Sequence, residues 1–340
     1  MNPSELPPPL QVLQMMMGHW VGQILGTVAE LGIADVLAKG PCDADAIAAA
    51  VKSNPDATHR MLRAAASVGI LHQDGKRFAL TPLGDCLRSD SPFGLRDLVV
   101  AELAPGHWLP WGRLRDAVMT GQPQAKAALG VEPWTYYAKN PTEGAWFARG
   151  MGNLSKMAAI DVTSVHDFSA HATICDVGGS QGALIAEVLR RSPKSRGVIF
   201  DRPDVVAEAA TAVKAYGLGD RLTTQGGDFF ESVPAADAYL LKHILHDWDD
   251  ARATAILKTV GRAAKPGATV YLVEMLLGDS PMATPVNLMD LNMLVMLGGR
   301  ERTRDELGAL LNAAGFTLQK VIPTVGLFAV LVATKNLHIS

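Results

Sequence analysis

Apolar residues at the start of the chain recur at helical spacing and predict a mostly helical N-terminal part. Residues 10–37 form one long or broken apolar stretch that glycines interrupt, and further helices are expected over 46–51 and 57–68. Residues 70–73 and 77–81 flank Asp74-Gly75, a dipeptide typical of a tight hairpin. Helices followed by a small hairpin are typical of a winged-helix domain.

After residue 172 the pattern changes to short β-type runs that alternate with helical stretches. The expected strands are 174–177, 198–200, 239–241 and 269–274, and the expected helices are 183–191, 205–216 and 250–264. This alternation predicts a parallel, doubly wound sheet, and two runs near the end, 316–322 and 327–334, predict adjacent strands that close one edge.

The fold class that follows is α/β, with a Rossmann-like doubly wound domain over 166–340. A mostly helical, winged-helix-like domain precedes it over 1–95, and a helical, aromatic-rich connecting segment covers 96–165. Winged helices often bind DNA, but residues 56–68 offer only His59, Arg60 and Arg63 where a recognition helix needs clustered basic residues. We therefore expect a structural domain that packs against a partner subunit or covers an active site.

Composition narrows the function classes further. Of 340 residues, 48% are hydrophobic and 19% are charged, which excludes a disordered chain. The net charge of −3 gives no chain-wide field for nucleic acid or anionic lipid. Three distant cysteines without a CxxC pair argue against a disulfide scaffold or structural zinc. With no signal peptide and no run of about 20 apolar residues, we expect a soluble cytoplasmic protein that binds neither nucleic acid nor membrane.

A glycine turn between an expected strand and an expected helix is the sharpest local motif. It reads Asp176-Val-Gly178-Gly179-Ser180-Gln-Gly182, and such a turn lets a ligand approach the backbone and a helix N-terminus. The dinucleotide pattern GxGxxG fails in every register, because Ser180 or Gln181 stands where a glycine is needed. Asp176 before the first glycine instead suits a ligand whose amino group lies over the turn.

Acidic residues follow the next two strands as well. Asp201 ends the second strand, where a carboxylate can accept hydrogen bonds from both ribose hydroxyls of an adenosine. Asp228, in Gly226-Gly-Asp-Phe-Phe230, ends what reads as the third strand, where the edge of an adenine would lie. Acidic residues in place of basic ones indicate an adenosine ligand without phosphates, and the cationic S-adenosylmethionine fits.

Two histidines follow the fourth strand, in Lys242-His243-Ile-Leu-His246-Asp247-Trp248. A single histidine could act as a general base, since its pKa near 6.5 lets it take up a proton at neutral pH. A metal pair is also conceivable, but no third ligand at suitable spacing accompanies it, so no metal is expected. Hydrogen-bonded core histidines remain the alternative.

These residues together resemble the caffeic-acid and acetylserotonin class of S-adenosylmethionine-dependent O-methyltransferases, including its bacterial secondary-metabolite members. The resemblance runs over nearly the whole chain. It rests on the ordered motifs ELGIAD at 30–35, DVGG at 176–179, FDRP at 200–203, GDFF at 227–230, LHDW at 245–248 and GRERT at 299–303. Two departures are Ser180-Gln181, where many members have another glycine, and Arg202, where leucine is common. A serine fits this turn only with negative φ or with strain.

The resemblance implies a role for each motif. Asp201 would hold the ribose, Asp228 and Phe229 the adenine, and Gly178, Gly179 and Asp176, with Lys242 nearby, the methionine portion. His246 would be the base, flanked and oriented by Glu274 and Glu301. His243 would matter much less.

The sequence also indicates which residues line the acceptor pocket and how the chain assembles. Asn292, Met293 and Met296 are spaced for one helical face, and Trp134, Phe147 and Met151 are candidates for the other wall of an acceptor pocket. The best match is a flat aromatic or polyketide-like small molecule with a hydroxyl group. The apolar stretch 10–37 and the resemblance both point to a homodimer. C- or N-methylation, a non-methylating reaction and a winged-helix regulator that senses an adenosine-type ligand stay open.

Overall fold

The computed structural model describes residues 6–91, 94–278 and 284–336, and it divides into two compact units. The first unit comprises Met1–Leu109 and Leu129–Leu154, and the second comprises Pro110–Ala128 and Ser155–Ser340. Residues 1–5, on which the expectation about a signal peptide partly rests, lie outside the described residues. In the described part, no helix is long and apolar enough to cross a membrane.

The first unit is mostly helical, as expected, and contains a small three-stranded sheet in the order β1-β3-β2. The stretch 10–37 is broken into three helices, and Gly32 adopts φ +68° where the second break occurs. Side chains of Asp43 and Asn54 cap α4 and α5. The elements are α1 (Pro8–Met16), α2 (Gly18–Glu30), α3 (Ile33–Leu37), β1 (Cys42–Asp43), α4 (Ala44–Val51), α5 (Pro55–Ser67), β2 (Leu71–Asp74), β3 (Arg77–Leu80), α6 (Pro82–Asp85) and α7 (Leu95–Leu103).

The remaining helices of the middle segment are short, because prolines interrupt the sequence, until one long helix ends the segment. They are α8 (Pro105–Trp111), α9 (Leu114–Thr120), α10 (Ala125–Leu129), α11 (Pro133–Lys139) and α12 (Pro141–Val165). The core of the first unit gathers the apolar faces of the early helices and the hairpin around Ile33, Ile47, Leu62 and Phe78.

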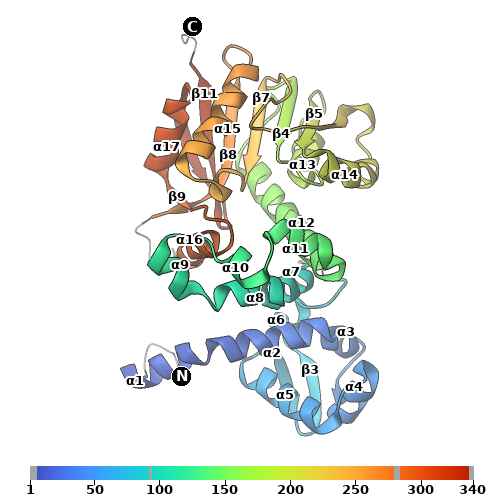
Figure 1. The fold of residues 1–340 in the computed structure, drawn as a ribbon. Coiled ribbons are helices and arrows are strands. Elements are labelled where there is room, and N and C mark those ends of the chain that lie inside the picture. Colours follow the sequence, from blue (N-terminus) through green and yellow to red (C-terminus); the bar gives the residue numbers. More distant parts are fainter. Residues whose placement is uncertain (1–5, 92–93, 279–283, 337–340) are drawn as a thin grey trace. The chain divides into compact units, whose positions relative to one another are not determined.

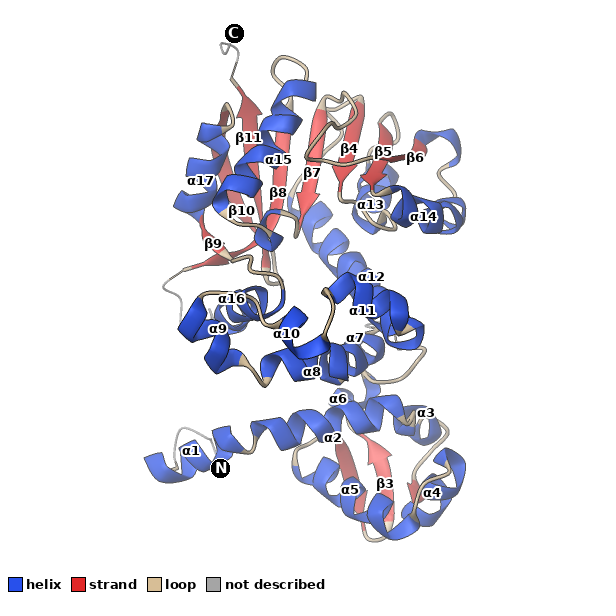
Figure 2. Cartoon of the chain, viewed as in Figure 1, coloured by secondary structure: helices blue, strands red, loops and turns tan. Residues whose placement is uncertain are grey.

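The second unit is built on a mixed sheet in the order β10-β11-β8-β7-β4-β5-β6 (Figures 1 and 2). Its five central strands from β8 to β6 are parallel, while β11 and β10 add antiparallel strands at one edge, which confirms the expected closing pair. The strands are β4 (Thr173–Val177), β5 (Arg196–Asp201), β6 (Leu222–Gly226), β7 (Ala238–Lys242), β8 (Thr269–Leu277), β9 (Arg302–Thr303), β10 (Phe316–Pro323) and β11 (Phe328–Lys335).

Helices cover both faces of this sheet, so its inner strands β4, β7 and β8 are buried on both sides, whereas the edge strands β6 and β10 are largely exposed. Alternate residues of β7 show the division: Tyr239 and Leu241 join the core with α15 and α17, whereas Ala238 and Leu240 join the core with α12 and α13. The elements that complete the unit are α13 (Ala183–Arg191), α14 (Pro203–Ala215), η2 (Gly219–Arg221), η3 (Leu245–Asp247), α15 (Asp250–Ala263), α16 (Thr284–Met296) and α17 (Arg304–Ala313).

Two expected positions differ from the structure, whereas β4 ends at Val177 as expected, with Asp176 one residue earlier. Glu274, the last residue of the expected strand 269–274, lies inside β8, which runs on to Leu277 and pairs there with β9. Asp228 lies two residues after β6 and not directly at its end.

Candidate active site

The carboxyl ends of the central parallel strands bring the predicted acidic and basic residues to one edge of the sheet. Asp176 pairs with Ile199 on β5 and with Leu240 on β7. Asp201 and Lys242 are the last residues of β5 and β7. In open α/β folds, ligands bind in the crevice at this edge.

The glycine turn after β4 packs so closely against its surroundings that two of its positions need a residue without a side chain. Gly178 has φ +70°, and its N–H donates to the carbonyl of Phe200 at 2.7 Å. A Cβ on Gly178 would collide with Ile244, and a Cβ on Gly179 would lie 2.9 Å from the carboxyl carbon of Asp176. Neither position tolerates a larger residue without movement of its surroundings.

Ser180 occupies the turn in the left-handed region, with φ +50°, so the strained option of the sequence prediction is the one realised. Asp201 supports it, since its Oδ2 accepts the Ser180 N–H at 2.9 Å. Its Oδ1 accepts the Arg202 N–H at 2.8 Å. Each carboxylate oxygen keeps a further lone pair, so Asp201 can hold the turn and still accept hydrogen bonds from two hydroxyls.

Asp176 is buried and Lys242 is half-buried next to the turn, and the charge of each affects the pKa of the other. Burial raises the pKa of Asp176 to about 7, against the opposing effect of the Lys242 charge. Burial lowers the pKa of Lys242, and the charges of Asp176, Glu274 and Asp247 oppose that shift. Such a pair can meet a ligand that carries both an ammonium and a carboxylate group.

Asp228 and Phe229 lie where β6 leads into the next loop. The Asp228 side chain accepts the N–H of Phe230 at 2.8 Å, which fixes the loop locally. The Phe229 ring lies edge-on to Phe230 and Trp248, and its Cε1 is 4.0 Å from the position of a Cβ on Gly178. An aromatic face therefore borders the glycine turn.

His246 lies in the 3-10 turn η3 and is 7% exposed. Its Nδ1 is 2.8 Å from Oε1 of Glu301, and its Nε2 is 3.4 Å from Oδ1 of Asp247. Burial alone would lower the pKa of His246, but the hydrogen bond to Glu301 and the charges of Asp247 and Glu274 raise it to about 9. The carboxylates around the imidazole thus make His246 more basic than an ordinary histidine.

Glu274 accepts hydrogen bonds from the backbone beside His246, whereas the imidazole ring is within hydrogen-bond distance of Glu301. Its Oε1 accepts the N–H groups of Leu245 at 3.2 Å and Ile244 at 3.4 Å. Burial raises the pKa of Glu274 to about 7, and its Oε2 is buried without a hydrogen-bond partner. The charge of Glu274 still contributes to the raised pKa of His246.

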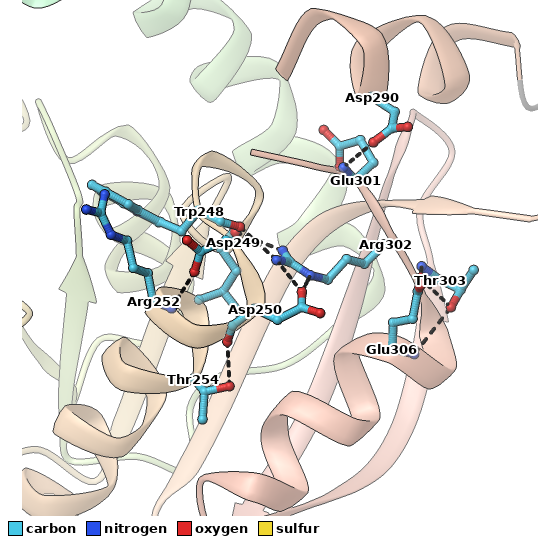
Figure 3. Close-up of polar contacts among 11 residues, drawn as sticks. Trp248, Asp249, Asp250, Arg252, Thr254, Asp290, Glu301, Arg302, Thr303 and Glu306 are labelled. Carbon is cyan, nitrogen blue, oxygen red and sulfur yellow. Dashed lines mark hydrogen bonds and ion pairs between the residues drawn. The ribbon is translucent and has the colours of Figure 1, made fainter. Parts of the chain in front are cut away.

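Two residues that the sequence did not single out hold this arrangement together (Figure 3). Asp290 on α16 accepts the backbone N–H of Glu301 at 2.9 Å. Arg302, only 2% exposed, donates to the carbonyls of Leu245 and Trp248 and to the carboxylate of Asp250. The GRERT motif therefore supplies both the partner of the imidazole and the support of the loop that carries it.

His243 stacks on His246, with ring centroids 4.2 Å apart and an interplanar angle of 24°. It has φ +52°, its Nε2 is buried without a partner, and burial lowers its pKa well below the ordinary value. Ligand atoms of His243, His246 and Glu301 lie within 4.8 Å of one another, so the third group that sequence spacing did not show is present. Nδ1 of His246 is already within hydrogen-bond distance of Glu301, and the absence of a metal stays a prediction.

The acceptor-pocket candidates divide between the two units. In the first unit, Phe147 stacks on Tyr137 at 4.9 Å and meets Trp134 edge-on at 5.9 Å, while Met151 lies on α12. His107, which no sequence motif marked, stacks on Phe147, and its Nδ1 is 2.8 Å from the Tyr137 hydroxyl. In the sequence, only the density of aromatic residues around it pointed to this cluster.

In the second unit, Met293 and Met296 are buried and Asn292 is half-buried on α16. Met289, which the sequence analysis omitted, shares this helical face, because it precedes Met293 by four residues. That the candidates of both units line one pocket stays a prediction.

Comparisons with known proteins match both parts of the chain. A family model described as an O-methyltransferase domain matches residues 111–317, and one described as an O-methyltransferase dimerisation domain matches residues 13–90. The phenazine O-methyltransferase of Lysobacter antibioticus is 36% identical over 315 residues, 92% of either chain. Mouse acetylserotonin O-methyltransferase is 34% identical, over 96% of this chain and 88% of its own. The structure of human N-acetylserotonin methyltransferase in complex with S-adenosylmethionine superposes with a TM-score of 0.89 at 30% identity, covering 98% and 99% of the two chains.

Proposed function

Because the chain belongs to the family of O-methyltransferases that carry a dimerisation domain, we propose that it methylates a hydroxyl group of a small aromatic or polyketide-like acceptor, with His246 as the general base. The methyl donor of this family is S-adenosylmethionine. The observation that carries the proposal is the 2.8 Å contact between Nδ1 of His246 and Glu301, a residue 55 positions away, at the ligand-binding edge of the sheet. An imidazole backed by a carboxylate is a well-known arrangement for a base.

The glycine turn and its acidic neighbours fit S-adenosylmethionine. Ile244 and Asp176 pack where a Cβ on Gly178 or Gly179 would lie, so both positions need glycine, and the donor would lie against the backbone of this turn. The spare lone pairs of Asp201 suit the two ribose hydroxyls, and Asp228 and Phe229 suit the adenine. The Asp176–Lys242 pair suits the amino and carboxylate groups of the methionine portion. When bound, the donor supplies a methyl group activated by a positive sulfur.

His246 would take the proton of the acceptor hydroxyl at Nε2. With Nδ1–H donating to Glu301, the lone pair of the neutral imidazole is at Nε2. A phenol has a pKa of about 10, so proton transfer to a base with a raised pKa of about 9 is much less uphill than the roughly 5 kcal/mol that an ordinary histidine would face. The remaining task of the protein is to align oxygen, methyl and sulfur in line.

The product imidazolium would be stabilised by three carboxylates. Glu301 bonds Nδ1, and Asp247 lies 3.4 Å from Nε2. Glu274 adds charge from the strand below while it fixes the backbone of η3. Since this charge also keeps the free imidazole protonated near neutral pH, His246 has to lose a proton before the acceptor can be deprotonated.

Methyl transfer can be tested directly with S-adenosylmethionine labelled in the methyl group. The enzyme is incubated with a panel of hydroxylated aromatic compounds, and products are identified by mass spectrometry with fragmentation. Label on an oxygen of at least one compound is the expected result. Label only on a carbon or nitrogen atom would show that the enzyme is a C- or N-methyltransferase. Binding of the donor without methyl transfer to any of the compounds would contradict the proposal that the protein is an enzyme.

The dimerisation domain suggests a homodimer, and we propose that α1 and α2 take part in its interface. These helices carry large apolar side chains that would be exposed to solvent in a monomer. They are Leu10, Val12, Leu13, Met15, Met16 and Trp20. The hairpin next to α5 is then the wing of a winged helix used for assembly. All three cysteines are free, which fits our proposal of a reducing cytoplasm.

A further inference from the structure

Asn292 on α16 is held by a hydrogen bond from a tryptophan far away in the sequence. The indole N–H of Trp111, the last residue of α8, lies 2.7 Å from Oδ1 of Asn292. Both residues belong to the second unit, and both partners are partly buried. An indole N–H can only donate, so the contact requires the carbonyl oxygen of the amide on this side.

The contact fixes which end of the amide is left for a ligand. With Oδ1 bound to Trp111, the free end is the NH₂ group, which has two hydrogens and no lone pair to offer. Its contact within the described residues is the Met289 sulfur at 3.8 Å, a weak acceptor. Asn292 therefore presents unused N–H donors on the helical face that it shares with Met289 and Met296.

We propose that Trp111 is a positioning residue which makes Asn292 a hydrogen-bond donor to the acceptor, and that the enzyme thereby selects hydroxylated aromatics bearing a second, hydrogen-bond-accepting oxygen. Such an oxygen is a carbonyl, methoxy or phenolate group. The proposal rests on the function proposed above, and it narrows the substrate class. A site built to donate one hydrogen bond discriminates strongly, because an analogue without the acceptor atom leaves the donor unpaired.

Two small probes test whether Asn292 acts as a hydrogen-bond donor. In 2-methoxyphenol, the oxygen next to the hydroxyl group can only accept a hydrogen bond. In 2-aminophenol, the amino group is a good donor but a poor acceptor. Affinities are measured by calorimetric titration of the enzyme in complex with S-adenosylhomocysteine, and kcat/KM is measured with the donor. We expect the wild type to favour 2-methoxyphenol over 2-aminophenol by tenfold or more, both in affinity and in kcat/KM. Trp111→Phe keeps an aromatic ring but removes the N–H donor, which frees the Asn292 amide to flip, so the preference should fall to within about twofold.

Asn292→Asp is the complementary variant, because it keeps an acceptor for the Trp111 N–H and turns a carboxylate toward the ligand. It should reverse the preference in favour of the amino probe. Trp108→Phe, the same exchange elsewhere on α8, is the control and should keep the wild-type ratio. A merely structural Trp111 would change stability but not the ratio of the two probes. If Asn292→Asp does not fold, Trp111→Phe decides alone.

A wild type that binds both probes equally, or neither, overturns the inference, and so does a Trp111→Phe variant with the wild-type ratio. Failure of the proposed function gives a different result. In that case the methoxy probe still binds with the expected preference, but no methyl group reaches it or any other hydroxyl compound.

Discussion

Oε1 of Glu301 lies 2.8 Å from Nδ1 of His246, and both residues are almost completely buried. Removing the imidazole should therefore stop methyl transfer. We expect His246→Ala to lower kcat by a factor of about 10³ or more, since a general base contributes roughly 10²–10⁴-fold. Donor affinity, measured by calorimetry, should stay within about threefold, because the proposed donor-binding residues are elsewhere.

His243→Ala is the matched control for that experiment. It removes the stacked ring but leaves the proposed base in place. Its effect on kcat should be much smaller, about tenfold or less. Equal losses in both variants, or full activity of His246→Ala on an unactivated phenol, would contradict the assignment of the base.

The pH dependence of turnover should report the raised pKa of His246. Because the imidazole must be neutral to accept a proton, kcat should rise with pH through an ionisation above the ordinary histidine value, toward about 9. Glu301→Gln removes the hydrogen-bonded carboxylate, so the rise should move to lower pH and the plateau should fall. An unchanged midpoint in this variant would show that Glu301 does not set the basicity of His246.

The same pair should contribute to stability over a defined pH window. The folded pKa of His246 lies above its unfolded value, so its stabilisation is fully present below pH 6.5 and is lost as pH rises through about 9. Thermal unfolding of the wild type and Glu301→Gln should differ more at pH 6 than at pH 10. A difference that grows toward high pH would have the wrong sign.

Asp201→Ala should weaken binding of S-adenosylmethionine and S-adenosylhomocysteine by about 10- to 150-fold, which corresponds to roughly 1.5–3 kcal/mol for lost charged hydrogen bonds. Asp204→Ala is the control, since its carboxylate is paired with Arg202 at the exposed surface. Calorimetry should show nearly unchanged affinity for the control. Equal affinity of Asp201→Ala and the wild type would rule out the ribose assignment.

Arg302→Met should destabilise the fold by about 2–3 kcal/mol, because two carbonyls and one carboxylate lose a buried charged donor. The loop that carries His246 should loosen as well, so kcat should fall more than donor affinity. Arg304 is exposed and lies two residues further on, so Arg304→Met should change neither the stability of the fold nor kcat by much. The measurements are chemical denaturation and steady-state kinetics, and equal behaviour of the two variants would contradict this role.

Light scattering should give a mass near twice the 36.1 kDa of one chain at micromolar concentration. Trp20→Asp and Met16→Asp should shift the equilibrium toward the monomer, since they place charges among exposed apolar side chains of α1 and α2. Glu231→Ala, an exposed change far along the chain, is the control. A monomeric wild type would contradict the proposed assembly.

Local patterns were enough to predict most strands and helices of the second unit, because apolar runs and turn residues alternate there. They predicted α13 to the residue and the paired strands at the edge. The two-residue strand β1 was missed, since two residues carry no periodicity. The extension of β8 past Glu274 was missed because it depends on β9, which is distant in sequence.

The site could be anticipated only where family motifs marked it. The motifs singled out His246 and Glu301, but the distance between the two residues depends on how α16 and β9 return to the sheet. The roles of Arg302, Asp290 and Trp111 could not be predicted from local patterns, because each depends on contacts with residues distant in the sequence. The left-handed Ser180 likewise depends on Asp201, which belongs to the next strand.

Asp290 and Asn292, two residues apart on α16, have different neighbours: one holds the backbone of Glu301, and the other is held by Trp111. For protein engineering, this means that the helix cannot be exchanged freely between relatives in order to change acceptor choice. A graft that alters the Asn292 side must keep Asp290 in register with Glu301, or the basicity of His246 changes together with the substrate. In the mechanism that we propose, acceptor choice and proton transfer both depend on α16, so libraries that vary only one face of this helix should contain more active members than libraries that replace it whole.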